Sequence, residues 1–318
     1  TAQTNIGVDM GFLKGKLNVT ADYYIKKTTD LLLAVPLPRT SGFNTMVQNY
    51  GALENKGFEL GISALVLSRG DLNWSTNFNI ASNKNKITKL AAPFNVYNRD
   101  IFRYEEGYPL YSFYFHEQTG VSKETGDIQF ADVDGDGVFD PNVDRKIVGN
   151  ANPDFFGGFT NTINYKAFDL MFFFQYSYGN DQLNWNRFFG EHGGTRDFNF
   201  MRSQLERWQN PGDETMVPRM TAANYAGNLR PSRFLEDGSY LRLKNISLGY
   251  TLPSSVISKV GLSAARVYVS GQNVLTFTKY TGADPELTGT ASTRLTQGIE
   301  FYSLPQPKVF MGGFNITF

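Results

Sequence analysis

Several residue types that carry common protein chemistry are missing or scarce in this sequence. None of the 318 residues is cysteine, which excludes a disulfide framework and a thiolate zinc site. Only two histidines occur, His116 and His192, so an imidazole-rich metal centre is not expected. Acidic and basic residues balance at 30 each, and this neutral charge gives no electrostatic reason to expect nucleic acid as a partner.

Long hydrophobic runs and catalytic signatures are also absent. No apolar stretch reaches the roughly 18 residues that a membrane helix needs. The first ten residues, TAQTNIGVDM, lack the basic start, apolar core and cleavage site of a signal peptide. The pairs His116–Glu117 and Glu191–His192 are isolated, and neither a G-x-S-x-G motif nor a phosphate-binding loop occurs. We therefore do not expect an enzyme.

The sequence is rich in aromatic residues and in two-residue alternation. Phe, Tyr and Trp make up 15% of the chain, which suits a surface where rings face something other than water. Strict alternation over eight or more residues predicts strands with one apolar and one polar face. The apolar faces include Trp74, Phe78, Phe172, Phe174, Phe314 and Ile316, and the polar face of the 72–86 segment carries Ser75, Asn77 and Asn79.

The length of these runs favours a membrane barrel over a soluble sandwich. Several runs last roughly 10 to 14 residues, near the length that a tilted strand needs to cross a bilayer. Sandwich strands are typically about 5–6 residues long. The polar faces are rich in Asn, Ser, Thr and Gln rather than in Lys and Glu, which suits a hydrated lumen. We therefore expect the apolar faces to contact membrane lipid.

Tight and long connections alternate along the chain, as the turns and loops of an outer-membrane barrel do. Tight turns are predicted at 13–15, 68–71 and 165–167, and long loops at 27–53, 87–153, 180–238 and 279–306. The alternation requires that residues 109–121 do not cross the membrane, so we assign them to an external hairpin arm. The predicted spans are 3–12, 16–27, 54–67, 72–86, 154–165, 168–179, 239–252, 264–278 and 307–318.

These nine spans are an odd number, whereas bacterial single-chain barrels carry even numbers of strands. An open sheet edge is not tolerated in hydrocarbon, because its backbone groups have no partner. We therefore expect the first and last spans to need further strands and the chain to be one piece of a longer polypeptide. The expected fold class is all-β, a transmembrane antiparallel β-barrel with long extracellular loops.

Six stretches resemble the C-terminal barrel half of SusC/RagA-type TonB-dependent transporters, and they follow the order of that family. Together they extend over nearly the whole chain. They are GALENKGFELGISA, EEGYPLYSFY, GDIQFADVDGDGVFD, DRKIVGNANPDFFGGFTNTINYKAFDLMFFFQYSYGND, DGSYLRLKNISLGYTLP and VYVSGQNVLTFTKYTGADPE.

The resemblance implies a barrel of about twenty-two strands with an N-terminal plug. Residues 1–318 would be the C-terminal part of that barrel, its last nine strands, in the cell outer membrane. The plug, the TonB-contacting segment and the signal peptide would lie in a part that is absent here. The resemblance also implies a SusD-like surface lipoprotein as a lid, energy from TonB in the inner membrane, and import of oligosaccharides or, in some members, peptides. The residues that contact the cargo stay unknown.

The segment DVDGDGVFD, residues 132–140, is the most specific local motif. Oxygen ligands at alternating positions with glycine at the sixth describe the start of an EF-hand-type calcium loop. Position twelve is Val143, so the closing acid comes one residue late and is Asp instead of Glu. The other interpretation is a turn with solvated carboxylates. The expected Ca²⁺ ligands are Asp132, Asp134, Asp136, the Val138 carbonyl, Asp140 and Asp144.

Two further features belong to the predicted loop 180–238. Residues 197–209 place Met201, Leu205 and Trp208 at helical spacing, which predicts a short helix whose apolar stripe packs within the loop. The rings of Trp185, Phe188 and Phe189 could stack on sugars, fill the barrel mouth or meet the lid.

The alternative function comes from a different class of protein. The chain could be a secreted, calcium-stabilised β-rich module that binds carbohydrate. Such a module would stay in solution without detergent, whereas a barrel segment would need detergent or the rest of its barrel.

Overall fold

The computed structural model describes residues 1–90, 92–96, 100–194, 199–225, 229–258, 261–287 and 297–318. A nine-stranded sheet dominates it, in the order β1-β2-β3-β4-β11-β12-β15-β16-β18. Every neighbouring pair in this sheet is antiparallel. The strands are β1 Ala2–Phe12, β2 Leu17–Pro36, β3 Thr45–Arg69, β4 Leu72–Leu90, β11 Phe155–Tyr165, β12 Phe168–Tyr178, β15 Tyr240–Thr251, β16 Ala264–Thr278 and β18 Val309–Thr317.

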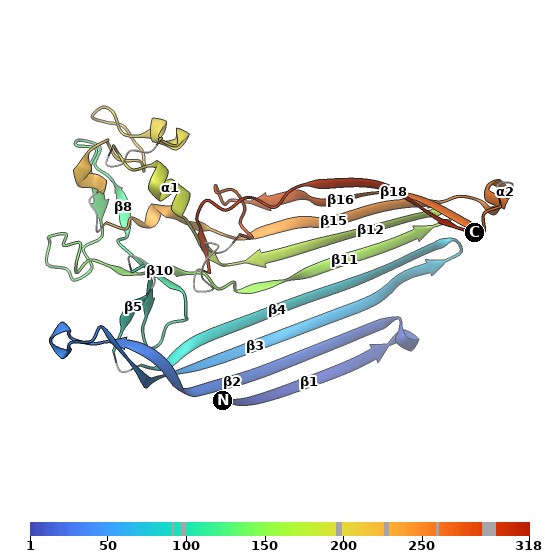
Figure 1. Cartoon of the computed structure of the whole chain (residues 1–318), viewed down its shortest axis with the longest axis horizontal. Helices are drawn as coiled ribbons and strands as arrows, with labels where there is room; N and C mark the ends of the chain where they lie inside the picture. Colours follow the sequence, from blue (N-terminus) through green and yellow to red (C-terminus); the bar gives the residue numbers. More distant parts are fainter. Residues whose placement is uncertain (91, 97–99, 195–198, 226–228, 259–260, 288–296) are drawn as a thin grey trace.

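The remaining elements lie mostly at one end of this sheet (Figure 1). They form a four-stranded sheet β10-β7-β6-β5, a three-stranded sheet β14-β13-β17 and the pair β8-β9. Their bounds are β5 Phe94–Val96, β6 Phe102–Tyr104, β7 Ser112–Phe115, β8 Gln118–Val121, β9 Ile128–Phe130, β10 Lys146–Asn150, β13 Asp181–Asn184, α1 Trp185–Gly190, β14 Leu235–Asp237 and β17 Ile299–Glu300. We call the described parts of 92–153, 180–238 and 279–306 the external region.

Among the described residues, the connections at the opposite end of the sheet are short (Figure 1). The turns around Lys14, Gly70 and Lys166 join consecutive strands there, and all three residues have positive φ. Helix α2 (Ser254–Ile257) joins β15 to β16 at this end. None of the helices among the described residues is long and apolar enough to cross a membrane.

The nine predicted spans correspond one to one with the nine strands of the large sheet, which confirms them. Residues 109–121 are not part of that sheet and contribute β7 and β8 to the external region, as expected. Within the described residues β1 and β18 are its two edge strands, each paired on one side.

The predicted long loop 27–53 is wrong for most of its length. Strand β2 continues to Pro36 and β3 begins at Thr45, so the two strands form a long hairpin joined by a short turn. Asp30 has a φ of 57°, and the register shifts between Thr28 and Leu32. This irregularity breaks the two-residue alternation, so the sequence pattern that predicts a strand stops there although the strand continues.

The helix predicted over 197–209 is also wrong in its described part. Residues Arg202–Glu206 form a single 3-10 turn, and Arg207 is already extended. The backbone N–H of Trp208 donates to the Val217 carbonyl at 2.9 Å instead of continuing a helix. The Trp208 ring packs against Gly126, where a Cβ would overlap the indole. This tertiary contact outweighs the local helical spacing. Residues 197 and 198 lie outside the described residues.

The register places the predicted apolar residues on one face of the large sheet. Phe78 lies opposite Phe159, which lies opposite Phe174 on the next strand. Farther along, Phe314 lies opposite Val267. No second sheet covers them among the described residues, and the Phe314 side chain is 72% exposed. A single sheet with an exposed apolar face is what lipid contact requires and what a sandwich excludes.

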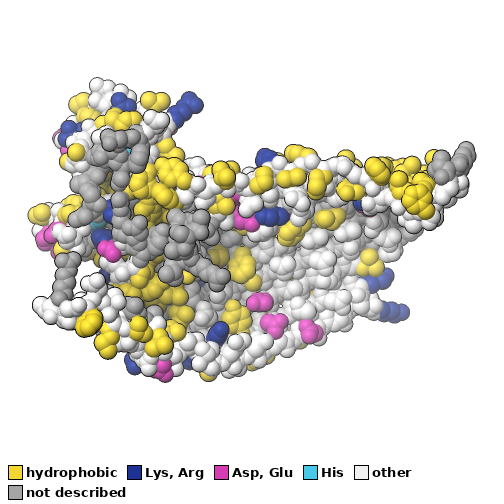
Figure 2. Space-filling model, viewed as in Figure 1, with side chains coloured by type: hydrophobic (Ala, Val, Ile, Leu, Met, Phe, Trp, Pro, Cys, Tyr) yellow, Lys and Arg dark blue, Asp and Glu magenta, His cyan; other side chains and the backbone are white. Residues whose placement is uncertain are grey.

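The other face of the sheet is polar. Ser75, Asn77 and Asn79 lie on it, as predicted, and the broad middle of the sheet in Figure 2 shows mostly white side chains with few yellow ones. Loop residues bind over this face: Arg242 of β15 donates to Asp284 at 2.5 Å and to Glu286 at 2.6 Å. We identify this face as the lumen wall.

The buried hydrophobic core lies in the external region rather than under the large sheet. It is built from Ile101, Phe102, Phe113, Phe115, Ala151, Leu183, Trp185, Phe234 and Ile299. Phe188 and Phe189 pack against it, and Trp185 is only 7% exposed. These three rings are therefore packing residues, and the external region is a folded unit with its own core.

His116 connects two segments of this external unit. Its ring is buried; Nε2 donates to the Pro141 carbonyl and Nδ1 accepts from the Arg230 N–H, both at 2.9 Å. This pair of bonds requires a neutral ring with its proton on Nε2. Burial lowers the pKa of His116, and the positive charges of Arg145 and Arg230 lower it further.

Arginine in place of Phe174, near the middle of β12, should destabilise the barrel by about 2–4 kcal/mol, because the charge would enter hydrocarbon. Met171→Arg, on the lumen side of the same strand, should cost much less. Denaturant titration of the complete barrel in lipid vesicles measures both. Equal costs for the two variants would show that the faces are assigned wrongly.

The external region should lose stability as the pH falls below about 6.5, the ordinary pKa of histidine. Below that pH an opened segment binds a proton, whereas folded His116 resists protonation; above it both states are neutral. His116→Gln, whose amide can make the same two hydrogen bonds, should flatten this dependence. Limited proteolysis between about pH 7.5 and pH 5 measures it. An unchanged pH profile in the variant would assign the effect to other groups.

Candidate functional site: a lumen-wall cavity and an acidic external loop

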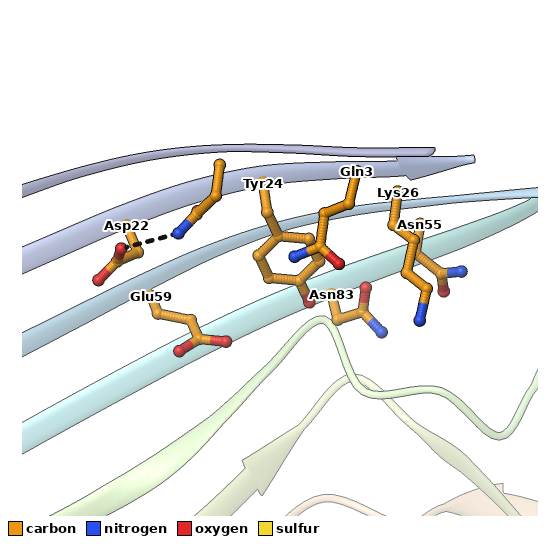
Figure 3. A pocket seen from close by; sticks show the side chains of 8 residues that line it. Gln3, Asp22, Tyr24, Lys26, Asn55, Glu59 and Asn83 are labelled. Atoms are coloured by element: carbon orange, nitrogen blue, oxygen red, sulfur yellow. Dashed lines mark hydrogen bonds between the residues drawn. The ribbon is translucent and has the colours of Figure 1, made fainter. Parts of the chain in front are cut away.

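A cavity of about 620 Å³ lies on the lumen wall over β1 to β4 (Figure 3). Its volume is within the range of small-ligand sites. The strand register arranges its side chains in cross-strand pairs: Asp22 lies opposite Glu59, and Lys26 lies opposite Asn55. The lining residues are Gln3, Asn5, Asp22, Tyr24, Lys26, Asn55, Glu59 and Asn83.

Glycine shapes the middle of this cavity. Tyr24 lies opposite Gly57, and a Cβ at position 57 would overlap the Tyr24 ring. The ring therefore lies against the β3 backbone, where no side chain holds it away. On the other side, Gly7 lies opposite Asp22, and the Asp22 carboxylate occupies the space that a side chain at position 7 would fill. The missing side chain at Gly57 thus lets the Tyr24 ring lie on β3, and the missing side chain at Gly7 makes room for the Asp22 carboxylate.

Charge is distributed unevenly along the cavity. Asp22 and Glu59 lie opposite each other in the strand register, and the Asp22 carboxylate lies over Gly7 of β1. Asn5 Nδ2 donates a long hydrogen bond to Asp22 Oδ1 at 3.4 Å. Lys26 lies at the other end, and no ion pair found in the described part of the chain includes it. The cavity therefore has an acidic end and a basic end, with Tyr24 between them (Figure 3).

The sequence pattern does not identify these residues as a site. The alternation placed each of them on a polar face, but Gln3 and Asn83 are far apart in the chain and no pattern shows that their strands contribute to one hollow. A usable signal was Gly57 within an otherwise regular strand, because a glycine in a strand marks a close approach by another group.

The acidic loop 132–144 brings part of its predicted ligand set together. One oxygen of each of Asp132, Asp134 and Asp136 lies within 4.8 Å of the others. Asp132 accepts hydrogen bonds from the backbone N–H groups of Gly135 and Gly137, both at 2.7 Å and both glycines at positive φ. The backbone thus wraps around the first carboxylate, as the start of a calcium loop requires.

The other predicted ligands are placed differently. Asp144 is buried and accepts from the N–H groups of Val133 and Asp140 at 2.7 Å, so its carboxylate closes the loop. Asp140 accepts from Asn142. The Val138 side chain is exposed, and its N–H donates to Asp136 at 2.8 Å. Asp140 and Asp144 are not in the group of three acids.

Carboxylate repulsion is visible in the pKa values of this loop. Hydrogen bonds from Gly137 and Gly135 lower the pKa of Asp132. For Asp134, a hydrogen bond from the Asp136 N–H also lowers the pKa. Desolvation and the charges of the neighbouring carboxylates outweigh this bond, so the pKa of Asp134 is raised. The donor set of hard oxygens fits a hard cation such as Ca²⁺, which would relieve this repulsion.

A buried ionic cluster in the external region was also missed from the sequence. Glu191 is fully buried and accepts from Arg187 at 2.8 Å, and Arg233 lies 3.1 Å from it. Burial alone would lower the pKa of Arg187, but its interactions with the carboxylates of Glu191 and Glu236 outweigh burial and raise that pKa. These ions bind α1 to the segment before β14, so the cluster holds the external unit together.

Comparison with known proteins identifies the family to which the chain is similar. The family model described as TonB dependent receptor-like, beta-barrel matches residues 1–274. TonB-dependent receptor P3 of Formosa agariphila is 38% identical over 99% of this chain and 34% of its own length. TonB-dependent receptor SusC of Bacteroides thetaiotaomicron is 30% identical over 100% of this chain and 32% of its own length.

A solved structure of the RagAB peptide transporter is similar in fold and sequence. It has a TM-score of 0.83 and 30% identity over 99% of this chain and 35% of that chain. The chain thus spans about a third of the length of the proteins it matches. The proteins named here are receptors or transporters rather than enzymes. The resemblance to SusC/RagA transporters is confirmed, and the secreted-module alternative is wrong. The chain belongs to the TonB dependent receptor-like beta-barrel family and forms part of an outer-membrane barrel.

Proposed function

We propose that this chain is part of an outer-membrane importer that takes up oligosaccharides or peptides with energy from TonB. The family match over residues 1–274 is the observation that supports it most. The polar lumen wall, lined by amides and carboxylates, supports a hydrated path for polar cargo. The external region, a folded unit over one end of the sheet, supports a point of entry there.

A SusD-like surface lipoprotein is proposed as the lid of this importer. Its docking is supported by large apolar side chains that stay exposed in the external region although that region has its own core. They are Phe200, Met201, Leu205, Met216, Met220, Tyr302 and Leu304. Leu304, at 87%, is the most exposed of them, and exposed apolar side chains that gather into a patch support contact with a partner.

We also propose Ca²⁺ as a stabilising ion of the acidic loop. Asp132, Asp134 and Asp136 would supply the first ligands, with the Val138 carbonyl, Asp140 and Asp144 completing the set. Phe139 of this loop stacks on Phe130 of β9 with ring centroids 4.6 Å apart, so the ion would stabilise the packing of the external unit. The proposed role is structural, because the acids belong to a loop that packs on β9 through Phe139.

Import is tested in cells that carry the intact protein. Uptake of a labelled oligosaccharide and peptide mixture should require the protein and should stop when TonB is deleted or the proton gradient is collapsed. Leu304→Asp should reduce copurification of a lipoprotein lid. The matched control is Val256→Asp, an exposed apolar residue in α2 at the other end of the barrel. Uptake that continues without TonB would contradict the proposed function.

Calcium binding is tested by titration of the detergent-purified protein with CaCl₂. Asp134→Ala should remove the binding and make 127–150 more sensitive to protease, while the barrel stays folded, because loop and strands are separate cooperative units. Glu124→Gln, an exposed acid in the same external region, is the control. Wild-type protein that binds no Ca²⁺, or a loop equally sensitive with and without it, would leave a solvated turn as the correct interpretation.

A further inference from the structure

The lipid-facing side of β4 changes from apolar to basic toward its external end (Figure 1). No register shift occurs between Phe78 and Lys86, so Lys84 and Lys86 lie on the same face as Phe78, because side chains alternate with period two. Both lysines are exposed, and no ion pair found in the described part of the chain includes either of them. Two uncompensated positive charges therefore lie on the side of the sheet that contacts lipid.

Two more lysines lie beside them on the neighbouring strands. Lys56 of β3 lies opposite Lys84. Glu54 of β3 lies opposite Lys86 on one side and opposite Lys27 of β2 on the other. Its carboxylate lies 2.7 Å from the Lys56 Nζ and 3.6 Å from the Lys27 Nζ. These five residues, which we call the lysine patch, carry four positive charges and one negative charge, and the single acid lies with Lys27 and Lys56.

Aromatic side chains on the same face indicate the level of the lysine patch in the membrane. Tyr23 of β2 lies opposite Phe58 of β3, and both rings are exposed. Tyrosine rings are typical of the boundary between hydrocarbon and headgroups. Lys56 follows two residues farther toward the external end of β3, about 7 Å along the strand. The lysine patch therefore lies at the level of the outer-leaflet headgroups.

The lysine patch is a local feature of the sheet. On β11, β12 and β15 the lipid-facing side stays apolar up to the external end of the strand, at Phe155, Tyr178 and Leu241. The absent parts of the barrel would leave the patch accessible: a plug would fill the lumen, and further strands would continue the sheet beside β1. Neither covers the lipid-facing side of β3 and β4.

We propose that the lysine patch binds the phosphate group of an outer-leaflet lipid, with Lys84 and Lys86 as its main contacts. A phosphate is an acceptor-rich anion to which lysine ammonium groups bind as point charges. In a phosphorylated lipid this group lies next to the acyl chains, and the chains would lie along the apolar surface at Phe58 and Phe78. A neutral headgroup would leave the two lysines uncompensated. The site lies outside the lumen, so it is independent of the import path.

Binding is tested with the complete, detergent-purified protein and two probes. The probes are lipid A with its phosphates and the same lipid after phosphatase treatment, and native mass spectrometry over a series of lipid concentrations measures each affinity. The phosphorylated lipid should bind roughly thirtyfold more tightly, because each lysine near an anionic headgroup contributes about fivefold. This comparison uses only the wild-type protein, so it does not depend on whether a variant folds.

Variants assign the binding to the lysine patch. The double variant Lys84→Gln and Lys86→Gln should bind the phosphorylated lipid roughly thirtyfold more weakly and the dephosphorylated lipid as the wild type does. The double variant Lys84→Arg and Lys86→Arg should keep the preference, since it keeps both charges. Lys26→Gln is the matched control, because Lys26 lies at a similar level of β2 but lines the lumen-wall cavity, and it should change neither affinity.

Equal binding of the two lipids by the wild type would overturn the proposal. So would a glutamine double variant that keeps its preference for the phosphorylated lipid, since the binding would then lie elsewhere on the barrel. A second copy of the chain is the other occupant that an exposed sheet face could take. If wild-type barrels associate in detergent, the glutamine variant separates them and phosphorylated lipid does not bind, the lysine patch is a subunit interface and the lipid site is wrong.

Discussion

Backbone hydrogen bonding in hydrocarbon is the constraint on which this structure depends. An unpaired amide inside a bilayer costs several kcal/mol, so each strand must be paired along its membrane-crossing length. The nine-stranded sheet meets this with antiparallel ladders such as β11–β12, in which all residues from Phe155 to Tyr165 are paired. Because a ladder fixes the register, it also fixes which side chains face lipid and which face the lumen.

Glycines on the lumen side let this rigid ladder carry large side chains across the strands. Tyr24 lies over Gly57, and Tyr268 lies over Gly313 in a directly opposed pair. Gly249 likewise leaves room for the ion pair in which Arg266 Nε donates to Asp169 at 2.8 Å. In each case the missing Cβ allows a side chain to lie flat on the wall. The lumen surface therefore depends on where glycine stands in the ladder.

The external region meets a different requirement, because it faces water and can bury an apolar core. Ile101, Phe113 and Trp185 come from three separate segments and pack together at one end of the sheet. Buried ions around Glu191 belong to the same unit, and a separate ion pair between Arg242 and Asp284 joins the 279–306 segment to the lumen wall. Such coupling between loop and strand gives the mouth of the barrel a defined shape, and it places loop residues where cargo would enter.

The sequence alone determined the crossing strands and their faces, because a two-residue period is a local property that Trp74 to Ile80 or Phe310 to Phe318 show by themselves. It also determined the family, through long motifs in a set order, and the oxygen-rich loop around Asp134. Sequence periodicity could not show that β2 and β3 continue past the membrane, since the bulge at Asp30 interrupts the pattern. Nor could it exclude a helix near Trp208, whose conformation is decided by packing on Gly126.

The cavity itself was decided only by the tertiary structure. Its lining residues come from strands β1 to β4 and its charges from β2 and β3, and their meeting in one hollow depends on strand order, register and the missing side chain at Gly57. Asp22 and Glu59, which lie opposite each other on β2 and β3, are 37 positions apart in the chain. No local sequence pattern shows that they become neighbours. Local periodicity specifies the face of each residue; only the hydrogen-bonded ladder specifies its neighbours across the strands.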